Sequence, residues 1–272
     1  MAPYHPQLRF HIDTAQKTAD ITAQFSEVDD YNLGQLSDDR DLVSTVHATM
    51  PTLEDRAQQL LDQYWTNPLH TSDPSNQLDV LIRVVEANWC PRHPELNGVQ
   101  GQWDATPTPK ILLLCAVPDP ERLTARFIHE FGHYLDWTQS GSHATRYMAG
   151  FLRAETAAEL LVAQHLGLSA LTHNTVCPPD ARANIHRLLA AEGDLNDQAA
   201  QEESFEYFEV HKGESGYDRR QRVQNAYALA NELVRTGRWT FGKLLRMDDQ
   251  AFRSALLSSP DLWLETVRVE QA

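Results

Sequence analysis

Residues Pro118-Asp-Pro-Glu-Arg-Leu-Thr-Ala-Arg-Phe-Ile-His-Glu-Phe-Gly-His-Tyr-Leu-Asp-Trp137 contain the pattern His-Glu-x-x-His at positions 129–133. Because residues four apart share one face of a helix, His129 and His133 could bind the same metal ion. Zinc is held by imidazole nitrogens at about 2.0–2.1 Å. Glu130 could act as the general base toward a water that the metal activates. The pattern therefore predicts a helix that supplies two zinc ligands and a catalytic base.

The neighbouring residues predict where this helix begins and ends. Asp119 is a good N-cap and Pro120 suits the first helical position. Ser140-Gly141 is expected to end the helix. An apolar stripe for packing is formed by Leu123, Phe127, Ile128, Phe131 and Leu135. The apolar run at 110–117 predicts a buried strand directly before it, which would fix both histidines rigidly.

A zinc site of this kind needs a third protein ligand, and the next predicted helix, 149–166, offers two candidates. Glu155 and Glu159 are four apart and share a face. Their neighbours are small or apolar, which indicates burial, and a buried carboxylate must be paired or bind metal. We favour Glu155 as the ligand and Glu159 as the acceptor for the second ring nitrogen of a ligand histidine. Glu159 as the ligand is the first alternative, and the others are His143, His165 and the acidic cluster 202–206.

The turn between the two helices offers donors for a developing oxyanion. Tyr147 is the first candidate and His143 the second. Asp136, almost one turn beyond His133, either orients a ligand or lies in solvent. Cys90-Pro-Arg-His93 has the spacing of metal ligands but no second half, so it is interpreted as a loop with a buried thiol.

The rest of the chain predicts an α+β protein. Strands are expected at 8–12, 78–86, 99–103 and 110–117, with a helix as the alternative at 78–86. A loop or solvated face is expected at 27–41. Further helices are expected at 51–65, 182–192, 197–210, 220–236 and 248–257. We therefore divide the chain into an N-terminal extension (1–77), a catalytic core (78–175) and a mainly helical C-terminal region (176–272).

Composition limits the partners that this chain could have. The net charge of −15 argues against nucleic acid, because phosphate binding needs a basic surface. No apolar run approaches the roughly 18 residues that span a membrane, and the first residues lack the pattern of a signal peptide. Three sparse cysteines indicate reduced thiols. A cytoplasmic protein is the expectation.

The two motifs together resemble the zincin metallopeptidases with a glutamate ligand, the gluzincins. His129-Glu130-Phe-Gly-His133 with Glu155-x-x-x-Glu159 is similar to the thermolysin-type arrangement, in which aspartate stands at the place of Glu159. The motif with Tyr147 also resembles the lethal-factor-like peptidases, in which a tyrosine shortly precedes the glutamate ligand. Residues 154–168 look like the second helix of the ImmA/IrrE and antirestriction-type metallopeptidases. The likeness covers roughly residues 78–168.

The resemblance implies a zincin-like core, in which a small sheet packs on the motif helix. It also implies a zinc-dependent metalloendopeptidase that acts on a protein or peptide substrate, with Zn²⁺ held by His129, His133 and Glu155. The alternative is a regulatory or binding protein on the same scaffold, with bound metal and little catalysis. The intact Glu130 favours the enzyme, since a scaffold needs no base.

Overall fold

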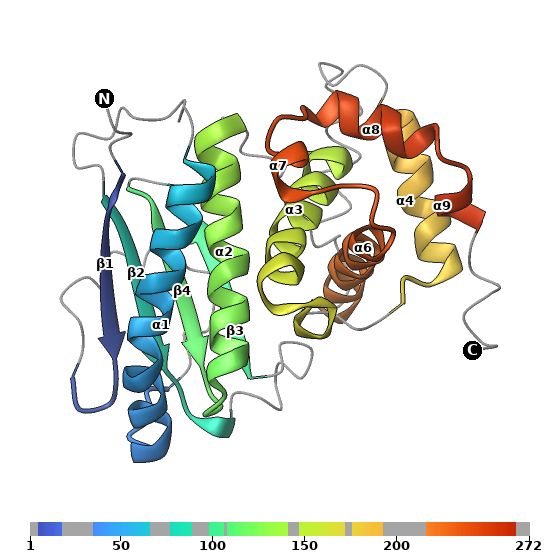
Figure 1. Cartoon of the computed structure of the whole chain (residues 1–272). Coiled ribbons are helices and arrows are strands. Elements are labelled where there is room, and N and C mark those ends of the chain that lie inside the picture. Colours follow the sequence, from blue (N-terminus) through green and yellow to red (C-terminus); the bar gives the residue numbers. More distant parts are fainter. Residues whose placement is uncertain are drawn as a thin grey trace.

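A four-stranded mixed sheet forms one side of the molecule (Figure 1). The structure is a computed structural model that describes residues 5–17, 35–65, 77–88, 98–105, 108–140, 147–171, 176–192 and 216–264. The strands are β1 (Gln7–Asp13), β2 (Gln77–Val84), β3 (Val99–Asp104) and β4 (Lys110–Cys115), in the order β1-β2-β4-β3. β1, β2 and β4 are parallel, whereas β3 is antiparallel to β4 and forms an edge. All four predicted strands are confirmed, with ends shifted by at most two residues.

Side chains alternate between the two faces of the sheet, and the face that meets the helices is apolar. In β2 and β4, one face contributes to the main apolar core through Leu78, Val80, Ile82, Val84, Ile111, Leu113 and Cys115. Side chains of successive strand residues point to opposite faces, so Asp79, Leu81 and Arg83 lie on the other face. β4 is buried over its whole length, as its continuous apolar run predicted.

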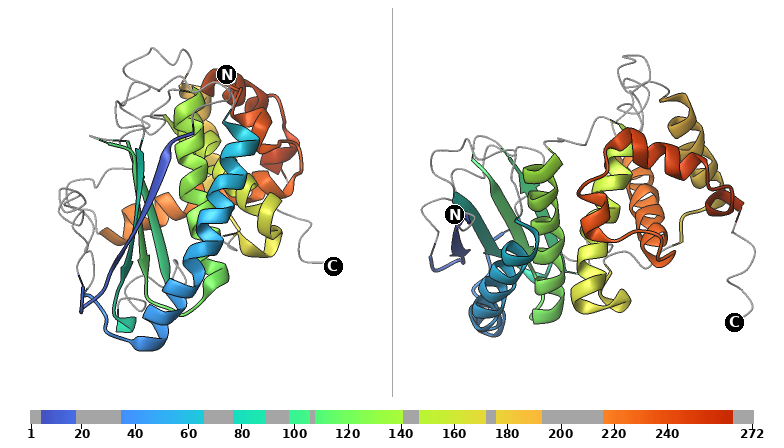
Figure 2. Two further views of the ribbon diagram at one scale, coloured as in Figure 1. Left: turned by 60° about the vertical axis from the view of Figure 1, so that its left-hand side comes forward. Right: turned by 45° about the horizontal axis from the view of Figure 1, so that its top comes forward.

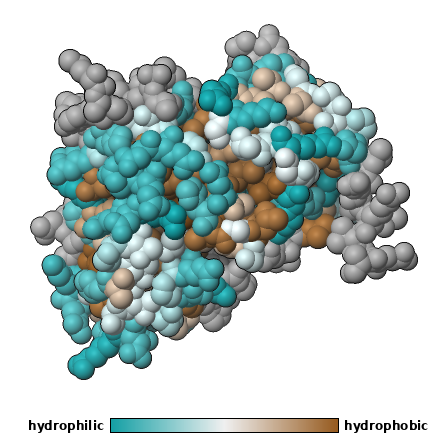
Figure 3. All heavy atoms as spheres, in the orientation of Figure 1, coloured by the Kyte–Doolittle hydropathy of each residue, from teal (hydrophilic) through white to brown (hydrophobic). Residues whose placement is uncertain are grey.

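Helix α1 (Arg40–Tyr64) begins eleven residues earlier than the predicted start at 51. Asp39 caps it by accepting hydrogen bonds from the amides of Asp41 and Leu42. The buried positions then follow helical spacing through Leu42, Val46, Thr49, Leu53, Ala57, Leu60 and Leu61. Pro51 lies inside the helix, where the sequence had suggested its start. In Figure 3 the outer face of α1 is largely hydrophilic.

Helix α2 (Pro120–Ser140) carries the motif and lies between the sheet and the remaining helices. Asp119 caps its first turn by accepting hydrogen bonds from the amides of Glu121 and Arg122, as predicted. α2 contacts α1, β3, β4 and α3. Figure 2 shows α1 and α2 side by side on one face of the sheet. The motif is thus held by the sheet on one side and by a helix on the other.

The C-terminal part of the described chain is helical. It consists of α3 (Met148–Leu166), the short 3-10 helix η4 (Leu168–Ala170), α4 (Pro179–Ala191), α6 (Gly216–Arg235), α7 (Phe241–Leu244), α8 (Asp249–Leu257) and α9 (Asp261–Leu264). The predicted helices at 149–166, 182–192, 220–236 and 248–257 are confirmed. The short helix α7 was not predicted. The predicted helix at 197–210 lies outside the described residues.

The proposed division at residue 77 falls between two paired strands. β1 pairs in parallel with β2, and α1 packs on α2, so residues assigned to the N-terminal extension form part of the same sheet and helix layer. We call β1–β4 with α1 and α2 the sheet half, and α3 to α9 the helical half. Among the described residues, no helix is long and apolar enough to cross a membrane.

Candidate metal centre

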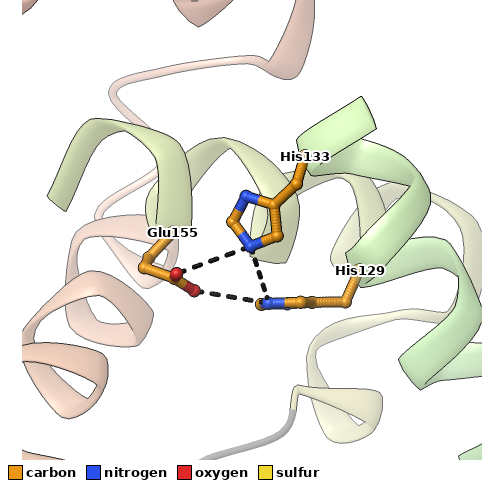
Figure 4. A group of neighbouring side chains, drawn as sticks. All are labelled: His129, His133 and Glu155. Atoms are coloured by element: carbon orange, nitrogen blue, oxygen red, sulfur yellow. Dashed lines mark hydrogen bonds and ion pairs between the residues drawn. The ribbon is translucent and has the colours of Figure 1, made fainter. Parts of the chain in front are cut away.

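Three potential metal ligands converge where α2 meets α3 (Figure 4). The Nε2 atoms of His129 and His133 are 3.1 Å apart. Glu155 reaches in from α3, with Oε2 3.3 Å from His129 Nε2 and Oε1 3.4 Å from His133 Nε2. The structure therefore brings together two histidines from the motif and the favoured glutamate from the next helix.

The geometry of this group fits a small divalent ion. Ligands about 2.05 Å from a tetrahedral zinc ion lie about 3.3 Å from one another. The two histidine nitrogens are 3.1 Å apart, and each lies 3.3 or 3.4 Å from a different oxygen of Glu155, so each contact is close to that edge length. Glu155 Oε2 is buried and accepts no well-aligned hydrogen bond from the described residues, although His129 lies close to it. Two imidazole nitrogens and a carboxylate oxygen are also a donor set that zinc prefers.

Close packing of the two helices makes this convergence possible. Gly132 lies between the two histidines, on the side of α2 that faces α3. A Cβ atom at this position would lie 3.0 Å from the backbone Cα of Ala158, tighter than ordinary contact. The glycine of the motif and the alanine of α3 therefore let the helix backbones approach closely. A larger residue at either place would push Glu155 away from the histidines.

Glu159 lies one turn beyond Glu155 and contacts the far side of the first histidine. Its Oε1 is 3.0 Å from His129 Nδ1, and its exposed fraction is 1%. A carboxylate here favours the tautomer in which His129 carries its proton on Nδ1 and leaves Nε2 free to bind. This geometry supports Glu159 as the orienting residue rather than the ligand.

The buried charges of the group favour a cation at its centre. Burial lowers the pKa of His129, but contacts with Glu155 and Glu159 and the nearby charge of Glu130 outweigh it and raise the pKa to about 10. Burial raises the pKa of Glu155, but the charge of His133 and contacts with both histidines outweigh it, so its pKa lies well below the usual range. The same negative potential that stabilises an imidazolium would stabilise a divalent metal ion.

Glu130 points toward the edge strand β3. It is 4% exposed, and Arg126, one turn earlier on α2, lies with Nη1 3.8 Å from Glu130 Oε1. Gly101 of β3 lies directly against both side chains, because a Cβ atom there would be 2.4 Å from Glu130 Oε1 and 2.6 Å from Arg126 Cδ. The absence of a side chain at this strand position leaves room for the candidate base.

The structure places the other candidates elsewhere or does not describe them. Tyr147 is the half-buried N-cap of α3, two turns before Glu155, and its role as an oxyanion donor stays a prediction. His165 lies against Arg56 of α1, and burial together with that charge lowers its pKa. Asp136 is buried and accepts two hydrogen bonds from Arg153, so it is not in solvent. Outside the described residues lie His143, the cluster 202–206 and Cys90 with His93.

Two residues beside the candidate base, Gly101 and Arg126, were not predicted from the sequence. Gly101 stands between two glutamines in a short strand, and only the register of β3 reveals that it faces α2. Arg126 has helical spacing to Glu130, which in the sequence looks like an ordinary i,i+4 pair on a solvated helix face. The pair Arg126–Glu130 differs from an exposed pair because it is buried, and its burial depends on the edge strand β3.

Comparison with known proteins returned no match, whether against family models, curated proteins or solved structures.

Proposed function

We propose that the protein is a zinc-dependent metalloendopeptidase of the zincin kind, which hydrolyses peptide bonds of a protein or peptide substrate. One observation carries the proposal: two histidine nitrogens lie 3.1 Å apart, each has an oxygen of Glu155 within 3.4 Å, and a buried glutamate is next in sequence to the first histidine. His129, His133 and Glu155 would hold the ion. When bound, zinc supplies Lewis acidity that polarises a carbonyl and lowers the pKa of water.

The chain's own residues would carry the proton transfers. Glu130 takes the proton from the attacking water and passes it to the leaving amine, which needs a carboxylate held near the scissile bond. Its burial against Gly101 restricts its rotamers and limits competing contacts with solvent. Glu159 keeps His129 in the tautomer that presents Nε2. Tyr147 is the proposed donor to the oxyanion.

A reducing compartment suits the described thiols, and we propose a cytoplasmic location. Cys115 and Cys177 are both buried, and neither forms a disulfide bond. Cysteines outside disulfide bonds are typical of proteins from compartments that keep thiols reduced.

Two variants separate the peptidase from a metal-binding scaffold. Glu130→Gln keeps the shape of the side chain but removes the base, so we expect zinc to stay near one equivalent per chain while peptide hydrolysis falls by about 100-fold or more. His129→Ala should lose the zinc itself. The matched control is Glu121→Gln, which changes an exposed glutamate in the first turn of the same helix.

Zinc content is measured by mass spectrometry of the metal, and hydrolysis by product analysis of a peptide library. Cleavage that continues unchanged in Glu130→Gln would contradict the mechanism. Full zinc occupancy without cleavage by the unaltered protein would support the scaffold alternative instead.

A further inference from the structure

Arg126 is a buried cation with too few partners. It is 7% exposed, yet its one ion pair within the described residues is the 3.8 Å approach of Nη1 to Glu130 Oε1. That separation exceeds hydrogen-bond length. Nη2 is buried and has no hydrogen-bond partner among the described residues. Removing a guanidinium from water is costly unless charged or polar groups replace its hydration.

Two other buried arginines of the described residues, Arg153 and Arg253, have more hydrogen bonds. Arg153 donates to two carboxylates and a carbonyl, and Arg253 donates to two backbone carbonyls. Arg126 instead has its stem against Gly101 and its head beside the candidate base. Its incomplete hydrogen bonding therefore coincides with the place where a substrate would lie.

We propose that Arg126 binds a carboxylate of the peptide substrate close to the scissile bond, and so selects for acidic substrates. The inference rests on the proposed peptidase function, because it uses Glu130 to mark the scissile bond. A guanidinium is a planar fork that matches a carboxylate, and Nη2 supplies the free donors. The carboxylate comes from an aspartate or glutamate side chain or from the chain terminus.

The position of Arg126 limits where that carboxylate can be. Four residues along a helix correspond to about 6 Å, and an extended peptide advances about 3.3 Å per residue. A carboxylate that reaches Arg126 while the scissile carbonyl lies near Glu130 therefore belongs to a residue within about two positions of the cleaved bond. Gly101 lets Arg126 and Glu130 lie together against β3, since a side chain there would collide with both residues.

The test uses zinc-loaded protein and three sets of alanine-based octapeptides. The first carries one glutamate at varied positions, the second has glutamine in its place, and both have blocked termini. The third is the glutamine set with a free C-terminal carboxylate. We expect kcat/KM to be about 10- to 100-fold higher for a carboxylate peptide than for its amide counterpart, the range for a hydrogen bond to a charged group. The first and third sets show which source of carboxylate is used.

Variants of Arg126 show whether it binds the substrate carboxylate or only supports Glu130. Arg126→Met should bring the ratio of kcat/KM between carboxylate and amide peptides to about one, and Arg126→Lys should keep part of the preference. Arg122→Met is the matched control, because Arg122 lies one turn earlier on α2 with a side chain 53% exposed. An equal loss for all peptides in Arg126→Met, or no preference in the unaltered protein, would overturn the proposal.

A binding measurement keeps the test independent of hydrolysis. Zinc-loaded Glu130→Gln is titrated with the same peptides by calorimetry. If the unaltered protein cleaves nothing, the peptidase proposal fails, but tighter binding of carboxylate peptides that Arg126→Met abolishes still supports the role of Arg126. Equal binding of carboxylate and amide peptides overturns it.

Discussion

The two halves of the molecule use buried charge differently. In the sheet half, the ion pairs Arg9–Asp79 and Arg83–Asp13 join β1 to β2 on the sheet face that points away from α1 and α2. The helix-facing side is apolar. In the helical half, buried arginines lie between the helices themselves. Arg153, Arg182 and Arg253 each bond to groups on other elements.

This difference bears on the candidate metal centre, because its ligands come from both halves. The histidines belong to α2 and the glutamates to α3. Arg153 lies on α3, two residues before Glu155, and its side chain joins Asp136 on α2 to Asp249 on α8. The helical half therefore contributes a ligand and also an ionic connection that holds the ligand's helix against the sheet half.

The largest expected effect is the loss of that connection. Arg153→Met leaves Asp136 and Asp249 without their shared buried cation, and removal of one partner from a buried network costs about 3–5 kcal/mol. The free energy of unfolding is measured by urea denaturation. Arg9→Met is the comparison in the sheet half, where the arginine side chain is 40% exposed and His11 stays beside the buried Asp79, so we expect a smaller loss of about 1–2 kcal/mol. Equal losses in the two variants would remove the contrast between the halves.

Removal of the metal tests whether the halves depend on the shared site. A ligand present at about 1,000 times its Kd stabilises the folded state by about 4 kcal/mol. We expect zinc to raise the free energy of unfolding by that amount over protein treated with a chelator. Glu155→Gln should lose most of this gain, since the helical half then supplies no charged ligand. Glu121→Gln should keep it, and a gain that survives in Glu155→Gln would exclude Glu155 as a ligand.

Local patterns predicted much of the fold and of the metal group. The His-Glu-x-x-His spacing, the cap at Asp119 and the apolar stripe of α2 act within one helix, so the sequence carries them directly. Glu155 could be predicted as a ligand because its small and apolar neighbours indicated burial. The early start of α1 was missed because an interior proline looked like a helix start.

Contacts between distant segments could not be read in the same way. Nothing in the sequence places Gly101 against Glu130, because that contact depends on the register of β3 with β4 and on how α2 lies across them. From the sequence, Asp136 could either orient a ligand or lie in solvent. Its actual partner is Arg153, which α3 places between α2 and α8. Such pairs come from tertiary packing, which leaves no periodic signal.

A smaller effect concerns the distance between the halves. Gly132→Ala adds a methyl group 3.0 Å from the Ala158 backbone, and such overpacking costs about 1–3 kcal/mol. We also expect weaker zinc binding, since α3 carries Glu155 away with it. Gly242→Ala in α7 is the matched control, because its added Cβ would meet only Tyr64 at 3.9 Å, an ordinary contact. The free energy of unfolding of Gly242→Ala should be unchanged or slightly higher. Thermal unfolding and zinc titration of both variants would decide whether close approach matters at this interface alone.

The last effect is absent at neutral pH and concerns the buried thiol of Cys177 in the helical half. Burial raises the pKa of the Cys177 thiol to about 12, with Arg182 opposing and Glu232 adding to the shift. An unfolded cysteine has a pKa of about 8.5, so above that pH the unfolded chain gains thiolate while the folded chain does not. The stability that Cys177 contributes is therefore complete below about pH 8.5 and is lost as the pH rises toward 12. The melting temperature should fall less steeply between pH 9 and 11 in Cys177→Ala than in the unaltered protein. Identical slopes, or rapid alkylation of Cys177 in the folded protein at pH 9, would show that the thiol is not shielded.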